Sequence, residues 1–148
     1  MVNIVGGNGA NLETLFHGRR YRLDFFQRDY VWTEAEIDRL LRDLETCFRD
    51  SWESSHSRTR VAQYEPYFLG PFVSHHTDQE TFITDGQQRF VTLLILLMYV
   101  RRLLVEQGDM PTATRIDGLV AKHEYGRPKF LLNVEEYERC FELRDPPA

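Results

Sequence analysis

A long apolar run that begins directly after a short turn constrains the fold of this chain more than any other feature. Residues Phe90–Val100 are almost entirely apolar, and two arginines follow them. The run is shorter than the roughly 20 residues that span a bilayer, so it predicts a buried core helix. A β-rich stretch, Thr81–Thr84, precedes it and ends at Asp85-Gly86. The sequence therefore predicts a strand, a tight turn and a helix over Gln87–Glu106.

The turn before this helix carries the side chains of a candidate nucleotide-phosphate site. It reads Asp85-Gly86-Gln87-Gln88-Arg89. A strand, a glycine turn and a helix start together direct backbone N–H groups and the positive end of the helix dipole outward. Arg89 can bind a phosphate oxygen, and Asp85 can hold a metal ion or orient a water. Either glutamine can bind phosphate or orient water. Asp and Gly are also ordinary turn residues, which is the plainer interpretation.

A second candidate segment lies between a predicted strand and a predicted helix. Apolar and charged residues alternate over Tyr21–Phe25, with the period of a half-buried strand. Gln27 and Arg28 follow, and ligand groups often gather in loops at strand ends. An anion with several charges needs more than one cation. We therefore expect Gln27 and Arg28 to meet the Asp85–Arg89 loop at one pocket. The alternatives are a surface pair, or a structural ion pair between Arg28 and Asp85.

Helices are predicted on both sides of this region. Asn11 can cap a short helix over Leu12–His17, and Thr33 with Glu36 forms a capping box for the next helix. That next helix carries one apolar stripe, Ile37, Leu40, Leu41, Leu44 and Phe48. A weaker helix is predicted over Thr112–His123. Another is predicted to begin at Asn133.

Short strands complete the predicted architecture. Tyr67–Ser74 and Glu80–Thr84 form a hairpin, with Pro71 at an edge or a bulge. Phe130–Leu132 is a further strand candidate, and Asp50–Ala62 reads as a polar loop. The predicted fold class is α+β, a small mixed sheet packed with helices. Its central helix should bury Leu93, Leu94, Leu96, Leu97 and Val100.

Length and charge limit the function classes. A chain of 148 residues predicts one compact domain over residues 11–143, with a flexible segment at 1–10 and a tail or linker at 144–148. The net charge of −5 excludes a nonspecific nucleic-acid binder over the whole surface but allows a local basic groove. Cys47 and Cys140 lack metal-site spacing and predict two buried thiols at helix-face positions in a reducing compartment. No signal pattern or membrane span is predicted, which favours a cytoplasmic protein.

Three motifs in order resemble a known family. They are Phe26-Gln27-Arg28-Asp29-Tyr30-Val31-Trp32, Phe68-Leu69-Gly70, and Asp85-Gly86-Gln87-Gln88-Arg89. Together they resemble the N-terminal domain of GmrSD-type restriction systems, over roughly Asn11 to Leu143. The resemblance implies a ParB/sulfiredoxin-like fold and a role in bacterial and archaeal defence against phage, often against modified DNA. It also implies that the DGQQR loop binds and hydrolyses a nucleotide.

The chain departs from the family and its relatives at a few positions. Asp24 stands where members usually carry proline, which affects the local turn. Members are commonly followed by an HNH-type nuclease domain, and no such His/Asn/His cluster occurs here. The expected partner is therefore a nuclease domain or subunit, through which the protein would act on DNA. The loop has no cysteine, unlike sulfiredoxin-like relatives, so peroxiredoxin repair is not expected.

The expected function is NTP binding with Mg²⁺-dependent hydrolysis, the base of the nucleotide remaining open. Catalysis would fall to Asp85, Gln87, Gln88 and Arg89. Gln27, Arg28 and Gly86 would bind the nucleotide, and Asp85 would be the metal ligand. Two alternatives stay open: a non-catalytic module that binds DNA or a partner, and a nuclease. The nuclease is disfavoured because such a site usually needs several carboxylates, and the motif supplies one.

Several other polar or aromatic groups have plainer interpretations. His75, His76 and Asp78 have a metal-like composition but are expected in a solvated hairpin turn. Tyr30 and Trp32 are expected to pack rather than stack on a base. Arg101 and Arg102 are expected at a solvated helix end, with a phosphate-contact patch as the alternative.

Overall fold

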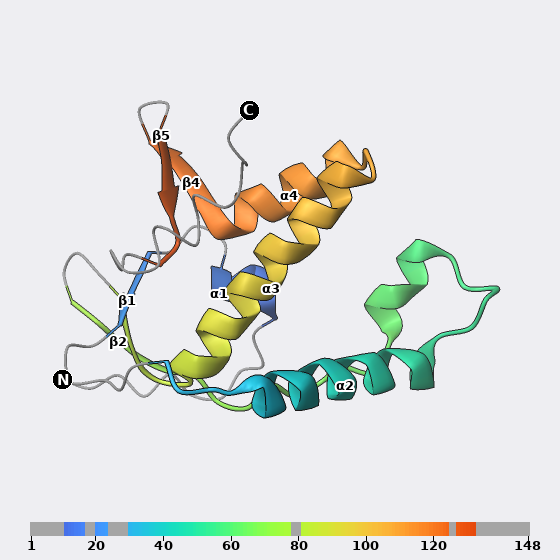
Figure 1. The fold of residues 1–148 in the computed structure, drawn as a ribbon, viewed down its shortest axis with the longest axis horizontal. Coiled ribbons are helices and arrows are strands. Elements are labelled where there is room, and N and C mark those ends of the chain that lie inside the picture. Colours follow the sequence, from blue (N-terminus) through green and yellow to red (C-terminus); the bar gives the residue numbers. More distant parts are fainter. Residues whose placement is uncertain (1–10, 17–19, 24–29, 78–80, 125–126, 133–148) are drawn as a thin grey trace. The chain divides into compact units, whose positions relative to one another are not determined.

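The chain folds as two compact units (Figure 1). The computed structural model describes residues 11–16, 20–23, 30–77, 81–124 and 127–132. Residues 28–70 form one unit, called here the insert unit. Residues 1–27 and 71–148 form the other, called the sheet unit. The insert unit thus interrupts the sheet unit in sequence.

A small mixed sheet lies in the sheet unit. Strand β1 spans Tyr21–Leu23, β2 spans Val73–His76 and β3 spans Thr81–Asp85. Their order is β1-β3-β2, with β1 parallel and β2 antiparallel to β3. The pairing of β2 with β3 shifts at Val73, just after the proline that was expected at an edge or a bulge. The α+β class is confirmed. The predicted hairpin is present, but its first strand is β2 and not Tyr67–Ser74, because only Val73 and Ser74 of that range pair with β3.

Two antiparallel helices and a second hairpin complete the sheet unit. Helix α3 spans Gln87–Glu106, as predicted, and packs along α4, Met110–Val120 (Figure 1). Asp109 caps α4 by accepting the N–H of Thr112 at 3.2 Å. Strand β4, Ala121–Glu124, pairs with β5, Arg127–Phe130. The predicted helix over Thr112–His123 therefore ends too late, because the backbone becomes extended at Ala121 to pair with β5.

The core of the sheet unit centres on Phe90, which is fully buried. The rings of Phe16 and Tyr21 meet it edge-on, each with centroids 4.9 Å away. Phe16 closes α1, Leu12–Phe16, which Asn11 caps by accepting the Thr14 N–H at 2.8 Å. This cap and helix were predicted. The aromatic contacts join α1, β1 and α3 at one point.

The core prediction for α3 is confirmed in part. Leu93 and Leu94 are buried, whereas Leu96, Leu97 and Val100 are only half-buried. Ile95 on the same helix is 43% exposed. Apolar side chains lie on nearly all faces of α3. Those that are fully buried lie in the first half of the helix.

A buried arginine lies near the end of α3, where a solvated helix end was expected. Arg101 is 8% exposed, and its Nε donates to Asp117 Oδ1 of α4 at 2.9 Å. The expectation is wrong for this residue because α4 folds back along α3 and brings its carboxylate to the guanidinium. It holds for Arg102, which is exposed and bonds to Glu106 one turn later.

The insert unit is built on one long helix. Helix α2 spans Glu34–Ser51 and begins at the predicted capping box, in which Thr33 N–H donates to Glu36 Oε2 at 2.7 Å. The hydrogen bonds from the Thr33 side chain and backbone hold the pKa of Glu36 below its ordinary value. On the predicted apolar stripe, Leu40 is buried, but Leu41 and Phe48 remain 41% and 44% exposed.

The segment after α2 is more ordered than the predicted loop. A 3₁₀ helix spans Arg58–Gln63 and begins within the expected loop over Asp50–Ala62. Tyr64 then packs its ring against Phe48, with centroids 5.7 Å apart, and its hydroxyl lies 2.9 Å from Nδ1 of His56. Ring packing on α2 thus supplies an anchor that turn composition does not reveal.

Some predictions fall on residues outside those that the structure describes. They concern the flexible segment 1–10, the continuation of β1 to Phe25, Asp78, the helix at Asn133, Cys140 and the tail 144–148. These stay predictions.

Candidate functional site

The candidate site begins where β3 ends. Asp85 is the last residue of β3 and is exposed. Its Oδ1 accepts the N–H of Gly86 at 2.7 Å, which fixes the carboxylate over the turn. An exposed carboxylate held in this way can present its second oxygen to solvent. The expected role of Asp85 in holding a cation or a water stays a prediction.

Gly86 makes the sharp change from strand to helix. Its φ of 82° and ψ of 11° lie in the left-handed region, which residues with a Cβ seldom adopt. A Cβ at this position would lie 2.8 Å from Phe72 Cδ1 and 3.1 Å from the Pro71 carbonyl oxygen. Both the backbone conformation and the space therefore require glycine. As the N-cap residue of α3 it has no side chain that could cover the helix start.

Gln87 has a supporting position in the structure. It is 6% exposed, and its Nε2 donates to the Ile83 carbonyl oxygen of β3 at 2.6 Å. This bond joins the first residue of α3 to β3 and so stabilises the turn on its buried side. Gln88, by contrast, is half-buried, and its backbone carbonyl oxygen accepts the Thr92 hydroxyl at 2.7 Å. Of the two amides, Gln88 is therefore the better placed for a ligand.

Arg89 is held against the segment that precedes β2. Its Nη2 donates to the Pro71 carbonyl oxygen at 2.8 Å, and its Cζ lies 5.5 Å from the centroid of the Phe72 ring. That distance is within the range of a cation–π contact. The Arg89 guanidinium thus lies on the same side of the turn as the close contacts of Gly86.

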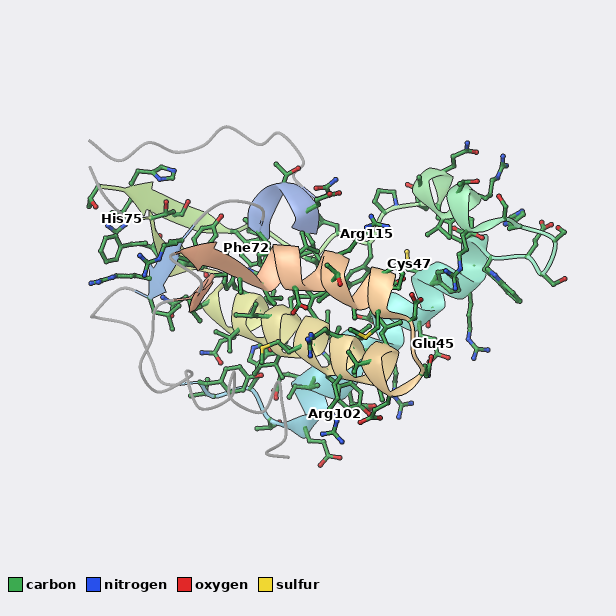
Figure 2. All side chains as sticks on the ribbon, turned by 90° about the horizontal axis from the view of Figure 1, so that it is seen from above. Glu45, Cys47, Phe72, His75, Arg102 and Arg115 are labelled. Carbon is green, nitrogen blue, oxygen red and sulfur yellow. The ribbon has the colours of Figure 1, made fainter. Side chains whose placement is uncertain are left out.

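Pro71 and Phe72 are the residues that sequence reasoning missed. They contact Gly86 and Arg89, and the Phe72 ring also meets Phe90 edge-on at 6.3 Å. Figure 2 labels Phe72 among the side chains of the sheet unit. The sequence signal that could have indicated Phe72 is its position two residues after the Phe68-Leu69-Gly70 motif, within a predicted strand.

The expected second half of the pocket lies outside the described residues. Gln27 and Arg28 both fall there, so the pocket that they would share with the Asp85–Arg89 loop stays a prediction. Among the residues that the structure describes, no group of three or more His, Cys, Asp or Glu side chains is placed to hold a metal ion. A single exposed carboxylate fits Mg²⁺, which commonly binds through one or two carboxylates together with the phosphates of its nucleotide.

The histidines after the Pro71 segment belong to a strand, not to a turn. His75 and His76 lie in β2, which corrects the expected turn over this stretch. The His75 ring stacks on Phe82 with centroids 5.0 Å apart, and His76 Nδ1 lies 2.8 Å from Thr81 Oγ1. These cross-strand pairs extend the hairpin by two residues, because each ring has a partner on β3.

Comparison with known proteins identifies a family over most of the chain. The family model described as "GmrSD restriction endonuclease, N-terminal domain" matches residues 12–144. Neither the curated proteins nor the solved structures gave a match. Within the described part of the chain, no helix has both the length and the apolar character to cross a membrane.

Proposed function

The chain belongs to the family of GmrSD restriction endonuclease N-terminal domains, a component of restriction systems, and from this premise we propose that it binds and hydrolyses an NTP at the Asp85–Arg89 loop. The observation that carries the proposal is the geometry of that loop. An exposed carboxylate, a left-handed glycine and a held arginine meet at the start of a helix of 20 residues. The positive end of such a helix attracts anions.

Each side chain of the loop has a part in this proposal. Arg89 would bind and neutralise phosphate oxygens, and Gln88 would bind phosphate or orient the attacking water. Asp85 would hold Mg²⁺, which would supply further positive charge to the phosphates. Gln87 would keep the turn closed through its bond to β3. Gln27 and Arg28 would add the second cation that a triphosphate calls for.

Phosphoryl transfer makes modest demands on side-chain chemistry, so the few polar groups of this loop can support hydrolysis. The reaction depends on positioning and on neutralising charge more than on covalent chemistry. The reaction then needs only a cation, a carboxylate that holds metal or water, and an amide. A nuclease reaction in this domain is a weaker alternative, because among the described residues no cluster of three carboxylate, histidine or cysteine ligands forms.

The wider setting follows from the family and is part of the same proposal. The domain would serve a DNA-acting antiphage complex in the cytoplasm, together with an HNH-type nuclease domain or subunit. The ParB/sulfiredoxin-like fold that the resemblance implies is compatible with a mixed sheet in which β1 and β3 run parallel.

The test is a calorimetric titration with each NTP, with and without Mg²⁺, followed by a phosphate-release assay. Arg89→Ala should weaken binding by more than about 1.5 kcal/mol, the order of a charge-assisted hydrogen bond. Arg102→Ala is the matched control, because it removes an equal charge from the exposed far end of the same helix. Equal affinity of the Arg89 and Arg102 variants, both folded, would remove Arg89 from the site.

Turnover needs a separate variant. Asp85→Asn should reduce phosphate release to background while the fold is kept, because the carboxylate is exposed and its bond to Gly86 is local. Asp38→Asn, at an exposed position on α2, is the control for loss of one negative charge. Full activity of Asp85→Asn would refute its role. Binding by the wild type without any turnover would favour the non-catalytic binding module instead.

A further inference from the structure

Phe72 contacts two residues of the candidate loop without belonging to the loop. Its ring lies 5.5 Å from Arg89 Cζ, and its Cδ1 would lie 2.8 Å from a Cβ on Gly86. The edge-on contact with the buried Phe90 ring fixes its position. The Phe72 ring is therefore positioned by its contact with the core, and it restricts the position of the Asp85–Arg89 loop.

An arginine side chain that is already held in place binds a phosphate with higher affinity than a mobile one. Its several rotatable bonds carry about 2 kcal/mol of rotamer entropy, which binding would otherwise have to offset. At Arg89 the Pro71 carbonyl on Nη2 and the Phe72 ring near Cζ both reduce that freedom. A guanidinium has five N–H donors, so it can hold a carbonyl and a phosphate oxygen at the same time.

We propose that Phe72 is a positioning residue, whose aromatic ring holds the Arg89 guanidinium beside the Asp85–Gly86 turn so that it meets the phosphates of a nucleotide. The proposal rests on the proposed function, in which Arg89 is the phosphate-binding cation. It adds a residue outside the loop and a physical reason for it. The attraction between a cation and the ring quadrupole requires an aromatic side chain, and an aliphatic one of similar size does not replace it.

The first arm of the test needs no nucleotide. The Arg89 guanidinium faces the Phe72 ring, whose ring current should shift the NMR signals of the adjacent Nε and δ-methylene protons upfield. Phe72→Leu should move these signals back toward ordinary arginine values, and Phe72→Tyr should keep the shift. Signals in the wild type at ordinary values would overturn the proposal without any variant.

The second arm measures NTP affinity. Phe72→Leu should weaken binding by about threefold to tenfold, the range expected for a partly exposed cation–π contact. Phe72→Tyr should bind as the wild type does. In an Arg89→Ala background Phe72→Leu should have no further effect, because the side chain through which it acts is gone.

The two arms separate failure of this proposal from failure of the proposed function. Wild-type affinity in folded Phe72→Leu, or an equal loss with and without Arg89, would show that the ring only packs, and would overturn the proposal. If the wild type binds no NTP, the proposed function fails. The NMR arm then still decides whether the ring positions Arg89.

Discussion

Replacing Gly86 by alanine tests the geometry of the candidate loop without any ligand. The left-handed conformation at φ 82° should cost a residue with a Cβ about 1–2 kcal/mol. The added methyl would also lie 2.8 Å from Phe72 Cδ1, and relieving an overpacked contact costs typically about 1–3 kcal/mol. Together these terms predict that Gly86→Ala lowers the free energy of unfolding by about 2–5 kcal/mol.

Two other glycines in the sheet unit provide matched controls. Gly108 has nearly the same φ, 79°, but a Cβ added there would meet no atom within 4 Å. Gly108→Ala should therefore show the backbone cost alone, about 1–2 kcal/mol. Gly118 is in α4 with open space around it, so Gly118→Ala should stabilise by about 0.5–1 kcal/mol. The difference between the first two variants isolates the contact with Phe72 and Pro71.

Urea denaturation followed by circular dichroism measures all three variants. A shift of the midpoint at constant slope would report stability alone. In a Phe72→Ala background the cost of Gly86→Ala should fall toward that of Gly108→Ala, because the closest atom is gone. Equal costs for Gly86→Ala and Gly108→Ala in the wild-type background would refute the close packing of the loop against Phe72.

Three further predictions follow from buried groups of the sheet unit. Gln87→Leu should cost about 1–3 kcal/mol in urea denaturation, because the Ile83 carbonyl loses its donor inside the core; a neutral result would contradict the inward bond. Arg101→Ala should cost about 3–5 kcal/mol by removing the cation from its carboxylate partner on α4, and a cost below about 1 kcal/mol would show that the pair is solvated. Leu94→Ala should cost about 2–5 kcal/mol and the half-buried Leu97→Ala clearly less, so equal thermal shifts would contradict the burial along α3.

Local signals predicted the elements that hold the candidate site. The bounds of α3 follow from the Asp-Gly turn and from the apolar run, both of which act within a few residues. The capping box at Thr33 and the Asn11 cap are local in the same sense. Such features depend on neighbours in sequence, so they can be recognised before the fold is known.

Contacts between distant segments could not be predicted in this way. Arg101 reads as a charge at a helix end, and its burial depends on the approach of α4. The Pro71 carbonyl and the Phe72 ring reach Arg89 only because β2 returns beside β3. Gln87 and Gln88 are the same residue type, and only the turn of the helix decides that the first points inward. Tertiary packing decides each of these positions.

The parallel pairing of β1 with β3 has a consequence for the order in which the protein folds. Tyr21 pairs with Thr81, and the whole insert unit is synthesised between them. The hairpin of β2 and β3 and the pair α3–α4 join neighbours and can form as they leave the ribosome. Strand β1 must wait for a long loop to close, which slows folding. Until then its Tyr21–Leu23 edge stays open to pairing with the wrong strand during synthesis.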